Sequence, residues 1–242
     1  MRTVSITLAL VASLALVLFS SCTITVKENK STKLTGETVK VTRACEPFDK
    51  ITMSGGRDIK YIEDDSCYVE IEADKALNAK VSTEVTDGIL NIALLQTSFD
   101  GNIFETDDKA QDDRTFTFHG MKNAIDKTLD DDIKVIVHAP YLNEIQSHGA
   151  IDFEADKVKS QGEFYLRVSG KSDTKIKRLE SRKVELSTSG LSDIEVGIYN
   201  ADTVGIKSSG KSDLDINFQN CGTANIQASG ACDAELKGSV RN

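Results

Sequence analysis

The motif Ser169-Gly-Lys-Ser-Asp173 returns as Ser189-Gly-Leu-Ser-Asp193, Ser209-Gly-Lys-Ser-Asp213 and Ser229-Gly-Ala-Cys-Asp233, each copy 20 residues after the last. A constant period of this length indicates a solenoid, in which each repeat forms one coil stacked on the one before it. The interval therefore fixes the architecture of this part of the chain.

The residues between the motifs indicate β-structure. With the first Ser as position 1, position 8 holds Ile176, Val196, Ile216 and Leu236, and position 18 holds Leu166, Leu186, Ile206 and Ile226. Apolar or small residues at positions 16, 18 and 20 alternate with polar ones, which is typical of strands. We predict an all-β parallel β-helix with two short strands per coil, around positions 5–9 and 15–20. Glycines that supply a positive φ would form the corner, at Gly149, Gly170, Gly190, Gly210 and Gly230.

More distant copies of the motif extend the solenoid upstream. Ser147–Asp152 is a copy expanded by one residue, and Ser54–Asp58 is a further copy, so the stack is expected to begin near Phe48. The phase is lost between these two copies, although strand-like runs persist at 68–73, 89–95 and 133–139.

Three stretches of the chain resemble a known family. They are Phe48-Asp-Lys-Ile-Thr-Met-Ser-Gly-Gly56, Val85-Thr-Asp-Gly-Ile-Leu-Asn-Ile92 and Ile133-Lys-Val-Ile-Val-His-Ala-Pro-Tyr-Leu142, which leads into the Ser-Gly repeats. Together they resemble the "putative auto-transporter adhesin, head GIN domain" family of Bacteroidetes-type lipoproteins, over residues 45 to 240. The resemblance implies the fold and an adhesin-like role, and it carries over no catalytic residues.

The N-terminus has the pattern of a lipoprotein signal. An uncharged run from Thr3 to Phe19 follows Arg2 and ends in Ser20-Ser21-Cys22. Such a run is shorter than the roughly 20 apolar residues of a membrane span. We expect cleavage of residues 1–21 and lipidation of Cys22; the alternative is an ordinary signal peptide with Cys22 as a spare thiol. Residues 22–43 would form a flexible tether, and 44–242 one β-helix domain, with irregular coils over 44–146 and regular coils over 147–242.

The charge of the chain argues against nucleic acid as a partner. The net charge is −9, and removal of Arg2 with the leader makes it −10. An acidic surface repels phosphate backbones. The segment 96–132 is an acidic insertion with four phenylalanines, for which a solvated loop and a partner-binding or metal-binding loop both remain open.

The repeated aspartates are the most evident candidate site, at Asp152, Asp173, Asp193, Asp213 and Asp233. A Ca²⁺ ladder is one interpretation, because Ca²⁺ takes six to eight oxygen ligands. The favoured alternative is that each Asp and its preceding Ser accept backbone N–H groups at the corner, with no cofactor bound.

Cysteines and histidines add little catalytic potential. Cys45 and Cys67 would fall at similar azimuths on adjacent coils, so a disulfide between them is geometrically feasible, whereas Cys221 and Cys232 are expected to be buried thiols. The three histidines match no catalytic or metal motif. His138 is expected to be structural.

We therefore expect a non-enzymatic lipoprotein of the cell envelope, anchored at the outer membrane, that binds a glycan or protein. The alternative is a β-helix polysaccharide lyase or hydrolase that uses stacked carboxylates. The uniform repetition and the lack of Trp count against the enzyme. The last coil leaves a strand edge through which a homo-oligomer would form.

Overall fold

The computed structural model describes residues 35–94 and 133–241, and their strands form a single sheet. The strands are β1 (Thr38–Ala44), β2 (Lys50–Glu63), β3 (Tyr68–Asp74), β4 (Val81–Thr86), β5 (Ile89–Leu94), β6 (Lys134–Ala139), β7 (Glu144–Ala155), β8 (Val158–Lys159), β9 (Glu163–Glu180), β10 (Lys183–Tyr199), β11 (Thr203–Cys221) and β12 (Thr223–Val240). The described part contains a four-residue helix, α1 (Lys75–Asn78), and no helix long and apolar enough to span a membrane.

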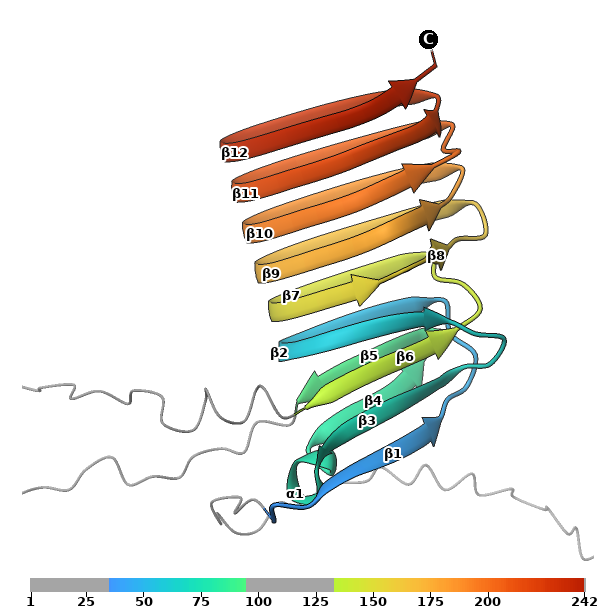
Figure 1. Ribbon diagram of the computed structural model, residues 1–242, viewed down its shortest axis with the longest axis vertical. Coiled ribbons are helices and arrows are strands. Elements are labelled where there is room, and N and C mark those ends of the chain that lie inside the picture. The colour runs from blue at the N-terminus through green and yellow to red at the C-terminus, as the bar shows by residue number, and fades with distance from the viewer. Residues whose placement is uncertain (1–34, 95–132, 242) are drawn as a thin grey trace, which may run out of the picture.

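The predicted solenoid is confirmed. The coils β2, β7, β9, β10, β11 and β12 stack in that order (Figure 1). Each coil bends at its Ser-Gly corner into two arms, which we call the first arm before the corner and the second arm after it. From β9 to β12 the parallel register places equivalent repeat positions side by side, as in Ser189 against Ser209 and Asp193 against Asp213. The strands differ from the prediction in being continuous around the Ser-Gly corner, because pairing with the neighbouring coils persists through the bend.

The upstream copies also take their predicted places. Gly55 pairs with Gly149, and Gly149 pairs with Gly170 despite the extra residue in the repeat. The motif that begins at Ser54 is thus a true coil of the stack.

The core is the row of side chains that points between the two arms. The aliphatic columns at positions 8 and 18 are buried in the inner coils, as in Leu166, Ile176 and Ile216. Alternate residues along both arms join them, and the same core continues into β2, β3, β5 and β6. Burial of one apolar row per arm is what the period-two pattern predicts.

Glycine is required at the corner for two reasons. Gly170 has φ 106° and Gly190 also has φ 106°, a region that disfavours side chains. A Cβ on either residue would also overlap the backbone of the glycine one coil below. At the other end of the coil, Asn200 and Asn220 adopt φ 58° and 56°, and the Nδ2 of Asn220 donates to the Oδ1 of Asn200 at 2.8 Å.

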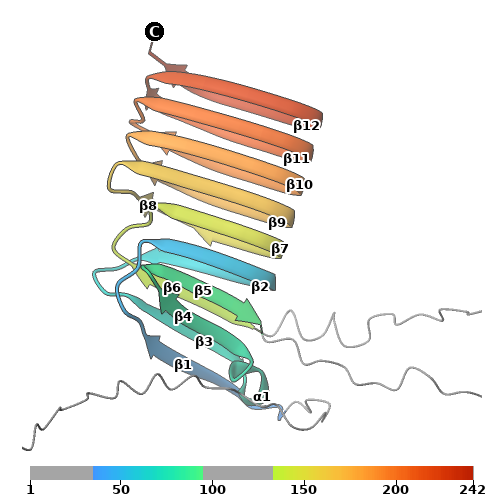
Figure 2. The ribbon, with the colours of Figure 1, turned by 180° about the vertical axis from the view of Figure 1, so that it is seen from behind.

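The N-terminal end departs from parallel coils. The first arm of β2 pairs in parallel with β5, and the second arm pairs in parallel with β6. The next pairings are antiparallel: β4 pairs with β5, β3 pairs with β6, and β1 pairs with β3. Figure 2 shows these strands closing that end of the stack. The strand-like runs in β3, β5 and β6 were predicted, whereas β4 and β1 were not.

β1 corrects the predicted tether. Residues 38–43 were expected to belong to a flexible segment, yet they pair with β3 in register from Thr38 against Asp74 to Ala44 against Tyr68. The edge of β3 that is not paired with β6 supplies the backbone hydrogen-bonding partner, which the sequence pattern does not reveal. The leader, Cys22 and the insertion 96–132 lie outside the described residues.

Candidate functional site

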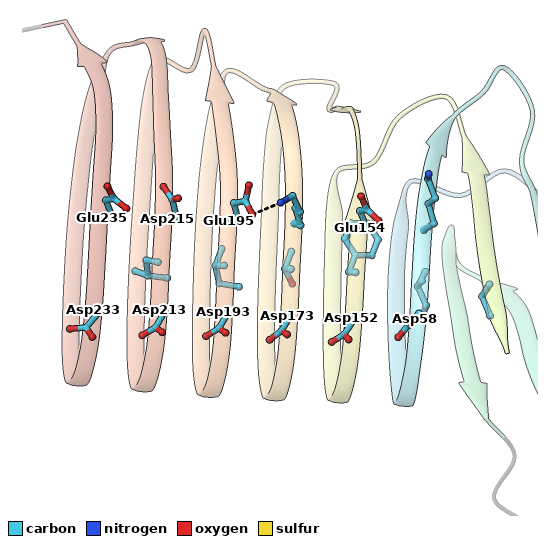
Figure 3. Close-up of a pocket in the computed structure, with 18 of the residues that line it drawn as sticks. Asp58, Asp152, Glu154, Asp173, Asp193, Glu195, Asp213, Asp215, Asp233 and Glu235 are labelled. Atoms are coloured by element: carbon cyan, nitrogen blue, oxygen red, sulfur yellow. Dashed lines mark hydrogen bonds and ion pairs between the residues drawn. The ribbon is translucent and has the colours of Figure 1, made fainter. Parts of the chain in front are cut away.

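A row of aspartates runs along the outer face of the second arms (Figure 3). It comprises Asp58, Asp152, Asp173, Asp193, Asp213 and Asp233, each paired in register with the next. Position 5 faces outward because positions 4 and 6 point into the core, where Ser192 and Ile194 are buried. Neighbouring coils in a sheet are roughly 4.8 Å apart, so the carboxylates form a closely spaced ladder.

The predicted role of these aspartates at the corner is wrong. Within the described part of the chain, no hydrogen bond or ion pair joins the carboxylates of Asp173, Asp193 and Asp213 to another group; these side chains are exposed and point outward. The preceding Ser does turn inward, and the Ser172 hydroxyl accepts from the Ile151 N–H at 3.3 Å. Outward alternation of the strand, which continues through the corner, is the physical reason for the difference.

A second outward row lies two residues further along each arm. It comprises Lys60, Glu154, Lys175, Glu195, Asp215 and Glu235, all of which border the same groove. Here opposite charges do pair: Lys175 Nζ lies 2.6 Å from Glu195 Oε2. Among the described residues, a lysine–carboxylate ion pair within a row is found only in the second row, although Lys134 of β6 lies in register with Asp58 at the end of the first.

The space between the two rows is a groove of about 1020 Å³ that extends from β6 to β12. Its walls carry ten carboxylates against three lysines. The floor is formed by the intervening residues, such as Thr174 and Leu214, whose side chains point into the core. The groove is therefore long and negatively charged along most of its length.

The groove offers little for metal binding. Among residues 35–94 and 133–241, no three His, Cys, Asp or Glu side chains converge in a geometry that could hold a metal ion. A carboxylate ladder on a flat strand face presents its oxygens side by side instead of around a point. The residues present thus do not form the six-oxygen or eight-oxygen cage that Ca²⁺ requires.

A smaller cavity of about 220 Å³ lies on the opposite face, beside Tyr165. Asn143 donates to Asp49 Oδ2 at 2.7 Å within it, and the Tyr165 hydroxyl donates to Glu163. That hydrogen bond is the main cause that raises the pKa of Tyr165 and lowers the pKa of Glu163. This cavity was not predicted from the sequence, although the outward aromatic side chain of Tyr165 in the repeat was a signal of it.

His138 is buried near the N-terminal end of the stack. Its ring stacks on Tyr68 with centroids 4.0 Å apart, and its nitrogens lie 3.6 Å from Asp64 and from Glu70. The N–H of Ser66 lowers the pKa of Asp64, and Lys40 lowers the pKa of Glu70. Burial and stacking fit the structural role expected for this histidine.

The four cysteines that the structure describes divide into a pair and two isolated residues. Cys45 and Cys67 lie side by side just beyond the β1–β3 pairing, each half-buried and with a free thiol. Their proximity arises from antiparallel strands and not from stacked coils, which was the predicted cause. Cys221 is buried as expected, but Cys232 is only half-buried because no coil covers β12 within the described part of the chain.

Stacked parallel coils with a long outer groove define an all-β solenoid. The chain belongs to the family described as "Putative auto-transporter adhesin, head GIN domain", which matches residues 47–241. No functionally curated protein matches the chain.

The fold is shared with solved structures, of which two are described here. One is described as a putative adhesin from Bacteroides fragilis, with 16% identity, a TM-score of 0.54, and coverage of 86% of this chain and 98% of that one. The other is described as a putative lipid binding protein from Parabacteroides distasonis, with 17% identity, a TM-score of 0.50, and coverage of 86% and 95%. At such identities the likeness concerns the fold alone.

Proposed function

We propose that this protein is a non-enzymatic, adhesin-like interaction module of the cell envelope, and that the groove between the two acidic rows is its binding surface. The observation that carries the proposal is the continuity of the groove, which borders every coil from β2 to β12. A ligand laid along it would contact equivalent positions repeatedly. Such a ligand is a polymer, either a protein segment or a glycan.

The negative charge of the groove indicates which protein segments or glycans would bind. Carboxylates outnumber lysines ten to three on its walls, and the first row is without cationic partners over β9 to β11 among the described residues. Complementary charge speeds association and rejects partners of like charge. We infer a basic protein segment or an amine-bearing glycan, and not an acidic polysaccharide.

The proposed location follows from the N-terminal sequence. The uncharged run that ends at Cys22 supports a lipid anchor at the outer membrane. With the coils standing off the bilayer, the groove would be accessible to a polymeric ligand. Protease treatment of whole cells would place the module on the surface if it is cleaved, and in the periplasm if it is protected.

The binding experiment compares two double variants that each remove two carboxylates. Asp193→Asn with Asp213→Asn changes the groove, and Glu163→Gln with Glu185→Gln changes the opposite face. An oligolysine peptide and a chitosan oligomer serve as cationic probes, with polyglutamate as the anionic one. Binding of either cationic probe, weakened at least about tenfold by the groove variant alone, is expected; a 1.4 kcal/mol loss corresponds to that factor. Equal loss in both variants would contradict the proposal.

The alternative is a polysaccharide lyase or hydrolase. Carboxylates on adjacent coils are roughly 4.8 Å apart, close to the spacing of about 5 Å between the carboxylates of retaining glycosidases. The row, however, repeats without a break, whereas a catalytic pair should differ from its neighbours. Product formation from a polysaccharide, abolished by one Asp→Asn change only, would establish the alternative.

A further inference from the structure

The aspartate row has a regular spacing that a bound polymer has to match. Its side chains lie in register on six successive coils (Figure 3), at Asp58, Asp152, Asp173, Asp193, Asp213 and Asp233. Neighbouring coils are roughly 4.8 Å apart, so every second carboxylate recurs after about 9.6 Å. The groove runs beside this row for its whole length.

The groove is too narrow for a helical ligand. Its walls are the side chains of positions 5 and 7, which are about 6.6 Å apart along each arm. The volume of about 1020 Å³ extends along seven strands, from β6 to β12, which gives a cross-section on the order of 35 Å². An α-helix with its side chains is at least 10 Å across and needs roughly 80 Å². A peptide in the groove is therefore an extended chain.

The floor of the groove favours one kind of extended chain. In the coils that the structure describes, position 6 is paired on both sides, as Ile194 is with Thr174 and Leu214. The N–H and C=O groups of such a ladder point to the neighbouring strands and not out of the sheet face. A ligand cannot join the sheet as another strand here, so its own backbone stays solvated. Polyproline II is the extended conformation with a fully solvated backbone.

Polyproline II also matches the spacing of the row. It repeats its side-chain direction every three residues, or about 9.3 Å, which is within about 0.3 Å of two coils. Over the six coils the accumulated difference is only about 0.6 Å. A β-strand repeats every two residues, or about 6.7 Å, and matches neither one coil nor two.

The carboxylates open to a ligand lie mainly along a single line. In the second row, Lys175 lies 2.6 Å from Glu195, and Lys237 lies 3.5 Å from Asp215. The aspartates of β9 to β11 have no such partners among the described residues. A cationic ligand thus gains most if its charges follow the aspartate row.

The surface of the groove favours a protein segment over a sugar chain. Among the described residues that line it, Phe153 is the one aromatic residue, and its side chain is buried in the core. Along the coils, the outward positions 5 and 7 carry carboxylates and lysines. They form ion pairs with cations but provide no aromatic ring against which a sugar could pack.

Building on the proposed function, we propose that the groove binds a basic protein segment in the polyproline II conformation, with a lysine or arginine at every third residue. Cations at residues i, i+3 and i+6 of the segment each lie between two neighbouring aspartates, so that three cations serve the six carboxylates. Each cation also relieves the repulsion between the two carboxylates that it joins.

The test compares two peptides of equal composition, Lys-Pro-Pro-Lys-Pro-Pro-Lys and Lys-Pro-Lys-Pro-Lys-Pro-Pro, on the full chain at low ionic strength. In polyproline II the lysines of the first share one direction, whereas those of the second point in three directions. Calorimetry should show that the first binds at least about fivefold more tightly. Asp193→Asn with Asp213→Asn should weaken it, and the control Glu163→Gln with Glu185→Gln should not.

Replacing the four prolines of the first peptide by glycine tests the conformation separately from the spacing. The cations keep their interval, but the preformed conformation is lost. Affinity should fall at least about fivefold, because the chain must then be ordered on binding. A glycine peptide that binds as tightly as the proline peptide overturns the proposal.

The remaining outcomes separate this proposal from the proposed function. Equal binding of the two lysine-proline peptides, or binding of oligolysine but of neither peptide, overturns the polyproline II assignment and leaves the cation-binding groove standing. A chitosan oligomer that binds more tightly than the first peptide assigns the groove to an amine-bearing glycan and also overturns the proposal. Failure of oligolysine, chitosan and both peptides to bind overturns the proposed function together with it.

Discussion

The backbone N–H of Cys45 donates to the carbonyl oxygen of Cys67 at 3.2 Å. The two residues extend the antiparallel β1–β3 pairing by one step beyond Ala44 and Tyr68, so they are direct cross-strand neighbours. Directly opposed residues have Cα atoms about 4.5 to 5.5 Å apart, within the range that a disulfide spans.

We predict that Cys45 and Cys67 form a disulfide when the protein is oxidised by a disulfide-donating oxidoreductase, which accepts the two electrons and two protons. Closing a loop of about 20 residues stabilises a fold by roughly 3 kcal/mol. Mass spectrometry after alkylation should show both thiols protected, and reductant should lower the Tm. The pKa of Cys45 is raised, mainly by desolvation and secondly by the neighbouring Cys67. Because the thiolate is the reactive form, oxidation should be faster at alkaline pH.

Cys67→Ser should abolish the effect of reductant on the Tm. Cys232→Ser is the control, because Cys232 lies at the far end of the stack and should leave the effect intact. A wild-type protein whose Tm does not respond to reductant after oxidation would contradict the prediction.

Gly190→Ala should destabilise the protein severely, because the corner requires a positive φ and close backbone contact with Gly170. Strained φ values cost about 1 to 3 kcal/mol, and the overlap adds to this. Gly205→Ala is the matched control, because the three atoms nearest to its Cβ all belong to the carboxylate of Glu185, which can rotate away. Denaturant unfolding should separate the two variants, and equal stability would refute the steric account.

The serines at position 4 should respond to truncation in opposite ways. The Ser172 hydroxyl donates to the carbonyl of Gly149 at 3.1 Å and accepts from Ile151, whereas the Ser212 hydroxyl is buried without a partner. Ser172→Ala should cost about 1 kcal/mol, and Ser212→Ala should be neutral or stabilising, since it removes a buried unpaired group. Thermal unfolding of the two variants measures the difference in sign.

Much of the fold could be predicted because it depends on local, repeated chemistry. The glycine corner and the inward columns at positions 8 and 18 each appear several times. An atypical residue in one repeat therefore does not hide the pattern that the other repeats show. β1 and β4 were missed because their pairing is antiparallel and non-repeating. The direction of the aspartates was missed because the motif was interpreted as a turn; the buried Ser and the outward Asp follow only when the strand is known to continue through the corner.

Asp74 should make stability depend on pH in the acidic range. Desolvation opposes its ionisation, but N–H groups of Ala76, Gly36 and Thr35 and the Thr35 hydroxyl donate to it, and the net effect lowers its pKa. A lowered folded pKa gives stability that is present above the unfolded pKa of about 4 and is lost as the pH falls through the folded value. Asp74→Asn should flatten this part of the profile. A variant profile parallel to that of the wild type would contradict the assignment.

The aspartate ladder should cost the protein stability. Asp213 lies in register between Asp193 and Asp233, and like charges directly opposed on neighbouring strands are destabilising. We expect Asp213→Asn to stabilise the fold by a few tenths of a kcal/mol. The gain should shrink in high salt, where the Debye length falls to about 3 Å at 1 M. Urea unfolding at low and high salt provides the measurement.

Glu195→Gln is the control for that prediction, with the opposite expected sign. Glu195 pairs with Lys175 at 2.6 Å in the second row, so neutralising it should be neutral or slightly destabilising. If both variants stabilise equally, the repulsion belongs to the net charge of the chain and not to the ladder. If only Asp213→Asn stabilises the fold, the repulsion arises locally within the aspartate row. A row that destabilises the fold on every coil is expected of a binding surface and not of a structural corner.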